Sequence, residues 1–220
     1  ERQIERNVNM NTILGSSFTL KNGQEIKNRL FKSAMSEQLG TRKHDPKPGL
    51  AKLYSRWAKG GIGLSMTGNI MIDRGALGEP KNVVLDEQSD LTEFKKWAAA
   101  GKENGSHIWA QLNHPGKQIP NFIVDEPVAP SAIALTRGLE KGFNKPRALL
   151  EDEILTIINK FATSAKLAKE AGFTGVQIHG AHGYLVSQFL SPRHNQREDQ
   201  WGGSLENRMR FVLSIYNAIR

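Results

Sequence analysis

A short stretch near residue 180 holds three side chains that can bind or transfer protons. His179, His182 and Tyr184 lie within six positions in the segment HGAHGYL. Two imidazole N–H groups can bind a carbonyl or phenolate oxygen and polarise it. A tyrosine keeps its proton at neutral pH because its ordinary pKa is about 10, so Tyr184 can act as a general acid. This cluster is the first candidate for a catalytic site.

The same cluster has two other interpretations. Two imidazoles can bind a metal ion, but a metal site usually needs a third ligand, and no carboxylate accompanies this pair. We therefore expect no metal. The histidines can also be structural residues beneath a loop. Because the three side chains directly follow an apolar segment, FTGVQI, that is typical of a strand, a functional role is favoured.

Three further groups of residues also follow apolar segments. Gln111 ends the segment HIWAQL, and its amide can both donate and accept hydrogen bonds. Such a side chain suits a ring that carries N–H and C=O groups, for example a flavin pyrimidine. Two other segments end in small residues, which let the backbone approach a flat ligand. These are Ser33, Ala34 and Ser36 in KSAMSEQ and Gly68 in MTGN.

Short apolar runs alternate with longer amphipathic segments, a pattern typical of a parallel sheet with helices. A hairpin over residues 16–30 comes first. The expected strands are 30–35, 62–67, 107–112 and 173–180, and the expected helices are 50–59, 91–104, 151–171 and 205–220. Polar residues after the strands match the active-site end of a (β/α)₈ barrel or of an open doubly wound sheet. No GxGxxG motif joins a strand to a helix, so a Rossmann dinucleotide site is not expected.

The ends of the helices and the long connections carry further signals. Asp90 and Ser204 are predicted N-caps, and Gly172 is predicted to end the third helix. The connection from Asn113 to Leu150 is too long for a simple link, and such loops are usually functional lids or carry their own hairpin. The stretch from 181 to 203 is expected to be irregular. The third helix has an apolar stripe formed by Ile154, Ile157, Ile158, Phe161, Ala165 and Ala168.

Composition excludes several classes of protein. The 220 residues are 38% hydrophobic and 24% charged, as in a globular chain, and no apolar run approaches the ~18 residues that span a bilayer. The segment ERQIERNVNMNTILG lacks the apolar core of a secretory signal. The absence of cysteine excludes disulfides and thiolate chemistry and is compatible with a cytoplasmic location.

The net charge of +8 is the remaining compositional signal. A pI of about 9.7 can indicate a nucleic-acid-binding protein, but the basic residues are scattered along the chain. Attraction of small anionic ligands such as phosphates explains the charge equally well. We expect neither a nucleic acid nor a membrane as partner.

Taken together, these segments resemble the Old Yellow Enzyme family of FMN-dependent ene-reductases. The matching stretches, in family order, are KNRLFKSAMSEQ, TGN, WAQLNHPGKQ, PVAPSAI, AGFTGVQIHGAHGYLVSQFLSPRHNQRED and WGGSLENRMRF. The resemblance implies an α/β fold of the (β/α)₈ TIM-barrel class that holds FMN at its C-terminal mouth. It also implies that NADH or NADPH serves as reductant for the activated C=C bond of an α,β-unsaturated carbonyl or related electrophilic alkene.

The resemblance further assigns roles to single residues. His179 and His182 are expected to bind the activating oxygen of the substrate, and Tyr184 to protonate its α-carbon. The residues expected to contact the flavin are Ser33, Ala34, Met35, Ser36, Gly68 and Gln111, with Ser36 bonded to flavin O4. Asn195, Arg197, Asp199 and the segment 206–208 are expected to clamp a loop to the last helix.

The sequence departs from the family in two ways. Ala34 stands where most relatives have proline. Residues 1–220 correspond to the N-terminal half of a single FMN-binding barrel, about four β/α units plus the hairpin, without the groups that hold the FMN phosphate. We therefore expect little bound FMN, no activity of the chain alone, and self-association as a homo-oligomer through exposed barrel edges. The alternative is a non-catalytic half-barrel with a binding or self-associating role.

Overall fold

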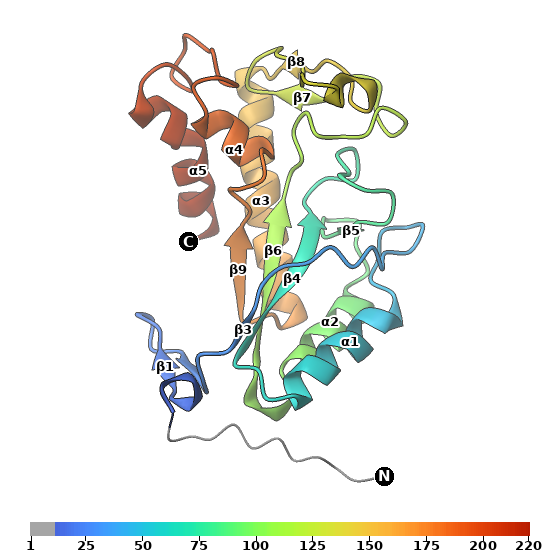
Figure 1. Ribbon diagram of the computed structural model, residues 1–220, viewed down its shortest axis with the longest axis vertical. Coiled ribbons are helices and arrows are strands. Elements are labelled where there is room, and N and C mark those ends of the chain that lie inside the picture. Colours follow the sequence, from blue (N-terminus) through green and yellow to red (C-terminus); the bar gives the residue numbers. More distant parts are fainter. Residues whose placement is uncertain (1–11) are drawn as a thin grey trace.

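The computed structural model describes residues 12–220, and its centre is a parallel sheet in the order β3-β4-β6-β9 (Figure 1). These strands are β3 (Phe31–Lys32), β4 (Leu64–Met71), β6 (His107–Asn113) and β9 (Gly175–Ile178). Each pairs in parallel with its neighbour, and a short strand β5 (Val83–Val84) extends the pairing at the carboxyl end of β4. The expected succession of parallel strands in chain order is confirmed.

Helices α1 (Pro48–Lys59), α2 (Leu91–Gly101) and α3 (Glu151–Ala171) alternate with these strands, and α5 (Leu205–Ile219) packs beside α3 (Figure 1). The core lies between sheet and helices because alternate residues of β6, namely Ile108, Ala110 and Leu112, are buried against them. The predicted apolar stripe of α3 is buried in the same core. The face of β6 with Trp109 and Gln111 points the other way, into the half-barrel.

The caps of the helices follow the sequence signals. Asp90 accepts a hydrogen bond from Thr92 N at 2.9 Å, and Ser204 accepts one from Asn207 N at 3.2 Å. Gly172 ends α3 with a φ of 94°. The first helix begins at Pro48, earlier than predicted, because proline is favourable at the first helical position.

The strand expected over 30–35 is wrong in its extent, since ladder pairing ends at Lys32. Further along β4, its pairing with β6 shifts register between Met66 and Asn69. There the side chain of Thr67 accepts the backbone N–H of Gln111 at 2.9 Å, in place of a main-chain carbonyl. Residues 33–36 then cross β4 as extended chain without continuing the ladder.

Two long connections contain more regular structure than expected. The connection after β6 holds β7 (Val128–Ala129), η3 (Leu139–Lys141) and β8 (Arg147–Ala148), and β7 pairs with β8 in parallel. It therefore does not carry an antiparallel hairpin built from these strands, because the chain loops back between them before running in the same direction. The stretch 181–203, expected to be irregular, contains helix α4 (Leu185–Leu190), whose Val186 and Phe189 are buried.

The loop between α4 and α5 is clamped to the last helix as expected, since Arg208 of α5 donates to the carbonyls of Leu190 and Gly203. Asn195 donates through Nδ2 to the carbonyls of Phe189 and Trp201, both at 2.8 Å. Arg197 donates to the carbonyls of Pro130 and Leu149 at 2.9 and 2.6 Å. These bonds join α4 to the long connection after β6 at the carboxyl end of the sheet.

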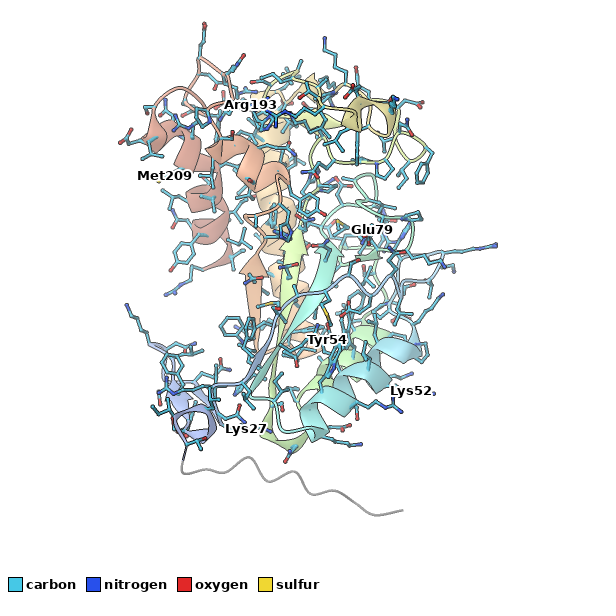
Figure 2. The ribbon with its side chains drawn as sticks, in the orientation of Figure 1. Lys27, Lys52, Tyr54, Glu79, Arg193 and Met209 are labelled. Carbon is cyan, nitrogen blue, oxygen red and sulfur yellow. The ribbon has the colours of Figure 1, made fainter. Side chains whose placement is uncertain are left out.

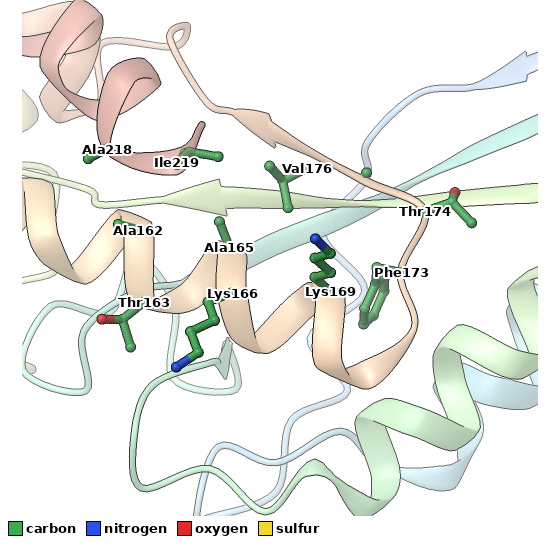
Figure 3. Close-up of a pocket in the computed structure, with 11 residues that line it drawn as sticks. Ala162, Thr163, Ala165, Lys166, Lys169, Phe173, Thr174, Val176, Ala218 and Ile219 are labelled. Carbon is green, nitrogen blue, oxygen red and sulfur yellow. The ribbon is translucent and has the colours of Figure 1, made fainter. Parts of the chain in front are cut away.

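Strands β3 and β9 are the two ends of the pairing order, so each has a partner on one side within residues 12–220. Beside β9 lies an open groove of about 680 Å³ (Figure 3). Apolar side chains of Phe173, Val176 and Ile219 line it, together with Lys166 and Lys169. This groove is the exposed flank of the half-barrel.

The N-terminal hairpin consists of β1 (Phe18–Thr19) and β2 (Glu25–Ile26), which pair antiparallel as predicted, after η1 (Ile13–Gly15). A further turn, η2 (Glu103–Gly105), follows α2. Most of the segment examined for a secretory signal, residues 1–11, lies outside the described residues. Among the helices in the described part of the chain, none combines the length and apolar character needed to cross a bilayer.

Candidate active site

The structure brings His179, His182 and Tyr184 together at the carboxyl end of β9. The ring centroids of His179 lie 5.1 Å from His182 and 5.0 Å from Tyr184, and those of His182 and Tyr184 are 6.2 Å apart. All three pairs meet nearly edge to face, with interplanar angles between 73° and 86°. Three rings that carry polar groups are thus gathered at one point.

The backbone that carries this cluster is tightly held. His182 has a φ of 58°, a left-handed conformation that is uncommon for a residue with a side chain. Its carbonyl accepts a hydrogen bond from Gln118 Nε2 at 2.8 Å, and a Cβ on Gly183 would lie 2.7 Å from that nitrogen. The surrounding structure therefore fixes the turn that presents His182, as strained residues at functional sites usually require.

Helix α4 fixes the position of Tyr184, its N-cap residue. Gln188, which is fully buried, donates to the carbonyls of Gly183 at 2.7 Å and Pro115 at 3.2 Å. The backbone N–H of Leu185 donates to the carbonyl of His114 at 3.0 Å. The loop after β6 and the loop after β9 thus form one hydrogen-bonded unit beneath the three rings.

The His179 ring is a neutral hydrogen-bond donor. Its Nδ1 accepts the backbone N–H of Ala181 at 3.2 Å, which leaves the ring proton on Nε2. Burial lowers the pKa of His179 to about 4, and the neighbouring His182 contributes in the same direction. At neutral pH the ring therefore offers an N–H group without a positive charge.

Tyr184 is held in its protonated form. Burial raises its pKa above the ordinary value of a phenol, and the Glu79 carboxylate adds to this effect, whereas the Asn69 side chain opposes it. A half-buried phenol that keeps its proton is suited to donate it to a reacting atom.

A row of side-chain amides crosses the inner face of the sheet. Asn69 of β4, Gln111 of β6 and Gln177 of β9 occupy matching register positions, so their side chains share one face. Gln111 Nε2 donates to Gln177 Oε1 at 2.8 Å, and Asn69 Oδ1 is buried without a partner. The row combines donors with a free acceptor, so it fits a flat ring that displays both N–H and C=O groups.

Residues 33–36 and Gly68, all predicted to contact the flavin, lie next to one another. A Cβ on Gly68 would overlap the carbonyl oxygen of Met35, so the segment 33–36 passes directly over Gly68 within β4. Met35 and Ser36 are exposed there. Ser36 Oγ donates to the carboxylate of Glu79, so the predicted bond from Ser36 to flavin O4 requires that hydroxyl to leave Glu79.

Sequence reasoning missed Asn69, Gln177 and Glu79. The alternation along β9 could have shown that Gln177 shares a face with His179, and Asn69 directly follows the glycine that was singled out. Glu79 lies in a loop, and no pattern among its neighbours in the sequence indicated a functional residue. Over residues 12–220, no three His, Asp or Glu side chains are grouped so that they could hold a metal ion.

Residues 15–220 match the model of the NADH:flavin oxidoreductase / NADH oxidase family. The chain therefore belongs to this family of FMN-dependent oxidoreductases, which use NAD(P)H. The NADH-dependent flavin oxidoreductase iliE of Hypocrea jecorina (strain QM6a) is 38% identical over 219 residues, 92% of this chain and 55% of that protein. This chain thus spans about half the length of the curated relatives that it matches.

Solved structures agree with this assignment. The old yellow enzyme homologue from Zymomonas mobilis superposes with a TM-score of 0.85 and 30% identity, over 94% of this chain and 59% of that one. Morphinone reductase in complex with tetrahydroNAD gives a TM-score of 0.86 and 29% identity, over 95% and 60% of the two chains. These likenesses confirm the fold expectation: the chain is part of an Old Yellow Enzyme type α/β barrel.

Proposed function

We propose that this chain supplies the substrate-binding and proton-donating part of an FMN-dependent oxidoreductase. The enzyme would use NAD(P)H to reduce the activated C=C bond of an α,β-unsaturated carbonyl compound. The observation that carries this proposal is the convergence of His179, His182 and Tyr184 within about 6 Å at the mouth of the half-barrel. Family membership supports the flavin chemistry, and the cluster supports the substrate class.

The two histidines would bind the carbonyl oxygen of the substrate. The neutral Nε2–H of His179 donates to that oxygen without placing a fixed positive charge in the pocket. Withdrawal of electron density through this oxygen makes the β-carbon of the alkene electrophilic. Tyr184, kept protonated by burial, then delivers its proton to the α-carbon.

The residues present fit the isoalloxazine ring of FMN. The amide row of Asn69, Gln111 and Gln177 would face its pyrimidine edge, and residues 33–36, lying over Gly68, would line one side. When bound, FMN supplies the redox chemistry by carrying hydride from NAD(P)H to the alkene. We infer that this chain alone retains little FMN, since the expected phosphate-binding loops belong to later strands of such a barrel.

The decisive experiment separates the two half-reactions in the whole protein loaded with FMN. Tyr184→Phe should slow alkene reduction by roughly 10²–10⁴-fold, the usual contribution of a general acid, while flavin reduction by NAD(P)H stays within a few-fold. His179→Ala should weaken binding of the alkene. Unchanged alkene turnover in Tyr184→Phe would rule out the assigned role.

The alternative, a half-barrel without flavin chemistry, makes a different prediction. It requires that no FMN binds even to the whole protein, which the absorbance spectrum of a purified sample reports directly. One equivalent of bound flavin would reject it.

We also propose that the isolated chain self-associates. The free edge of β9 and the groove beside it expose apolar side chains that pairing with a second copy would cover. Light scattering at micromolar concentration should give a mass above that of the monomer, and a stable monomer would contradict the proposal. We place the protein in the cytoplasm, where NAD(P)H is available, and propose no nucleic-acid or membrane partner.

A further inference from the structure

Glu79 lies at the mouth of the site, and beyond its effect on the pKa of Tyr184 the proposed function gives it no role. It belongs to the connection between β4 and β5, and Figure 2 shows it near the carboxyl ends of the central strands. Its backbone N–H donates to Asn82 Oδ1 at 2.7 Å, and its carboxylate accepts the hydroxyl of Ser36. Because both the backbone and the carboxylate are held, the charge has a fixed position.

This carboxylate is not neutralised by a neighbouring base. The ion pairs formed within the described part of the chain do not include Glu79. Two rings of the site bring no fixed positive charge, since His179 is neutral at pH 7 and Tyr184, whose pKa Glu79 raises, is a protonated phenol. Glu79 therefore adds a negative charge at the mouth of the site.

We propose that Glu79 is a specificity-determining residue whose carboxylate makes the site select electrophilic alkenes without a negative charge over alkenes that carry a carboxylate. The inference rests on the proposed function and narrows its substrate class. A substrate whose carbonyl oxygen is bound by His179 and His182 lies beside Tyr184, within range of the Glu79 charge. Two like charges several ångströms apart, at an effective dielectric constant near 20, repel strongly enough to change reaction rates by roughly tenfold.

The first test compares an anionic substrate, (E)-4-oxo-2-pentenoate, with its neutral methyl ester, and takes the ratio of the two rates so that their intrinsic reactivities cancel between variants. Both contain the same enone, and only the acid is an anion at pH 7. In the whole protein loaded with FMN, Glu79→Gln should raise the ratio of kcat/KM for the acid to kcat/KM for the ester roughly tenfold. Glutamine keeps an oxygen for the Ser36 hydroxyl, so the variant removes the charge and retains an acceptor.

Glu87 provides the matched control because it is an exposed glutamate in the connection between β5 and α2. Glu87→Gln makes the same change in net charge and should leave both substrates unaffected. If Glu79→Gln and Glu87→Gln change the acid-to-ester ratio equally, the proposal is wrong.

A second measurement needs no activity. In the whole protein, ¹³Cζ-labelled tyrosine reports on each phenol, and the resonance that disappears in Tyr184→Phe is that of Tyr184. Glu79→Gln should lower the midpoint of Tyr184 ionisation, and Glu87→Gln should not. An unmoved midpoint overturns the inference, whereas failure of the unsubstituted protein to reduce either compound rejects the proposed function instead.

Discussion

The carbonyl oxygen of Met35 lies directly over the α-carbon of Gly68, with no room for a side chain between them. A Cβ on residue 68 would also overlap the carboxylate of Glu37. This crossing lies where β4 changes register and where the ladder of β3 has ended. It joins the first two strands of the half-barrel at the edge where we propose that the flavin ring lies.

Replacing Gly68 by alanine should therefore destabilise the chain. Because the neighbouring atoms are backbone and a buried carboxylate, the methyl group can be accommodated only if residues 33–37 move. We expect a loss of about 1–3 kcal/mol in the free energy of unfolding, as for other overpacked positions, measured by urea denaturation with circular dichroism.

Gly49 is the matched control. It lies in the first turn of α1, and a Cβ there would meet only the Leu39 side chain, at an ordinary 3.7 Å. Gly49→Ala should be neutral or stabilising, since alanine is the better helix former. Equal effects of the two substitutions would show that the Met35–Gly68 crossing does not exist.

A second prediction concerns the buried charges beneath this crossing. Lys32 Nζ donates to the carbonyl of Met66 at 2.9 Å and to Tyr54 Oη at 3.1 Å, and lies 3.4 Å from Glu37 Oε1 (Tyr54 in Figure 2). The side chains of Lys32 and Glu37 are only 9% and 10% exposed. Lys32→Met should cost about 3–5 kcal/mol, because it leaves the Glu37 carboxylate buried without its cation.

The double variant tests whether the pair acts as a unit. Lys32→Met with Glu37→Gln removes both charges, so it should be less destabilised than the sum of the two single variants. The coupling energy from this cycle should exceed about 1 kcal/mol. Simple additivity would contradict the contact.

The third prediction is a loss of stability in mild acid. Burial lowers the pKa of both His179 and His114 to about 4, whereas both rings titrate near 6.5 in the unfolded chain. Between these values the unfolded state binds more protons, so the free energy of unfolding falls as the pH falls from about 6.5 to about 4. Above pH 7 these two rings add no slope. Each ring contributes at most about 1.4 kcal/mol per pH unit in that window.

Urea denaturation at half-unit intervals of pH measures this slope. His114→Gln should remove about half of it, and the added change His179→Asn should remove most of the rest. The slope is informative even where a variant is less stable overall, because an offset that does not depend on pH leaves it unchanged. If the slope remains after both substitutions, titratable groups other than His114 and His179 cause it.

How far the sequence predicts this molecule depends on how local each feature is. The buried stripe of α3 and the caps at Asp90 and Ser204 follow from residues within a few positions of one another. The histidine–tyrosine cluster could be predicted from the sequence equally well, because its members lie on one turn after β9. Family resemblance added the order of the strands and the barrel.

Features that depend on distant partners could not be predicted. The extent of β3 depends on its pairing with β4, whose partner residues lie 33 positions further along the chain. The bond between Ser36 and Glu79 joins residues 43 positions apart, and neither residue's neighbours indicate it. Helix α4 was missed because it is short, and its burial comes from packing against distant segments such as β7.

The last prediction tests how Tyr184 is held. Gln188 satisfies the carbonyls of Gly183 and Pro115 and accepts the backbone N–H of Lys117 at 3.4 Å. Gln188→Leu would leave these buried groups without partners, at a cost of about 1–3 kcal/mol for the most deeply buried of them. The ¹³Cζ resonance of Tyr184 should shift as well, because the turn at Gly183 loses its support.

Exposed Gln88 is the control, since Gln88→Leu should change stability by less than about 0.5 kcal/mol. If Gln188→Leu destabilises the fold and leaves the Tyr184 resonance in place, Gln188 supports the core alone and does not position the proton donor.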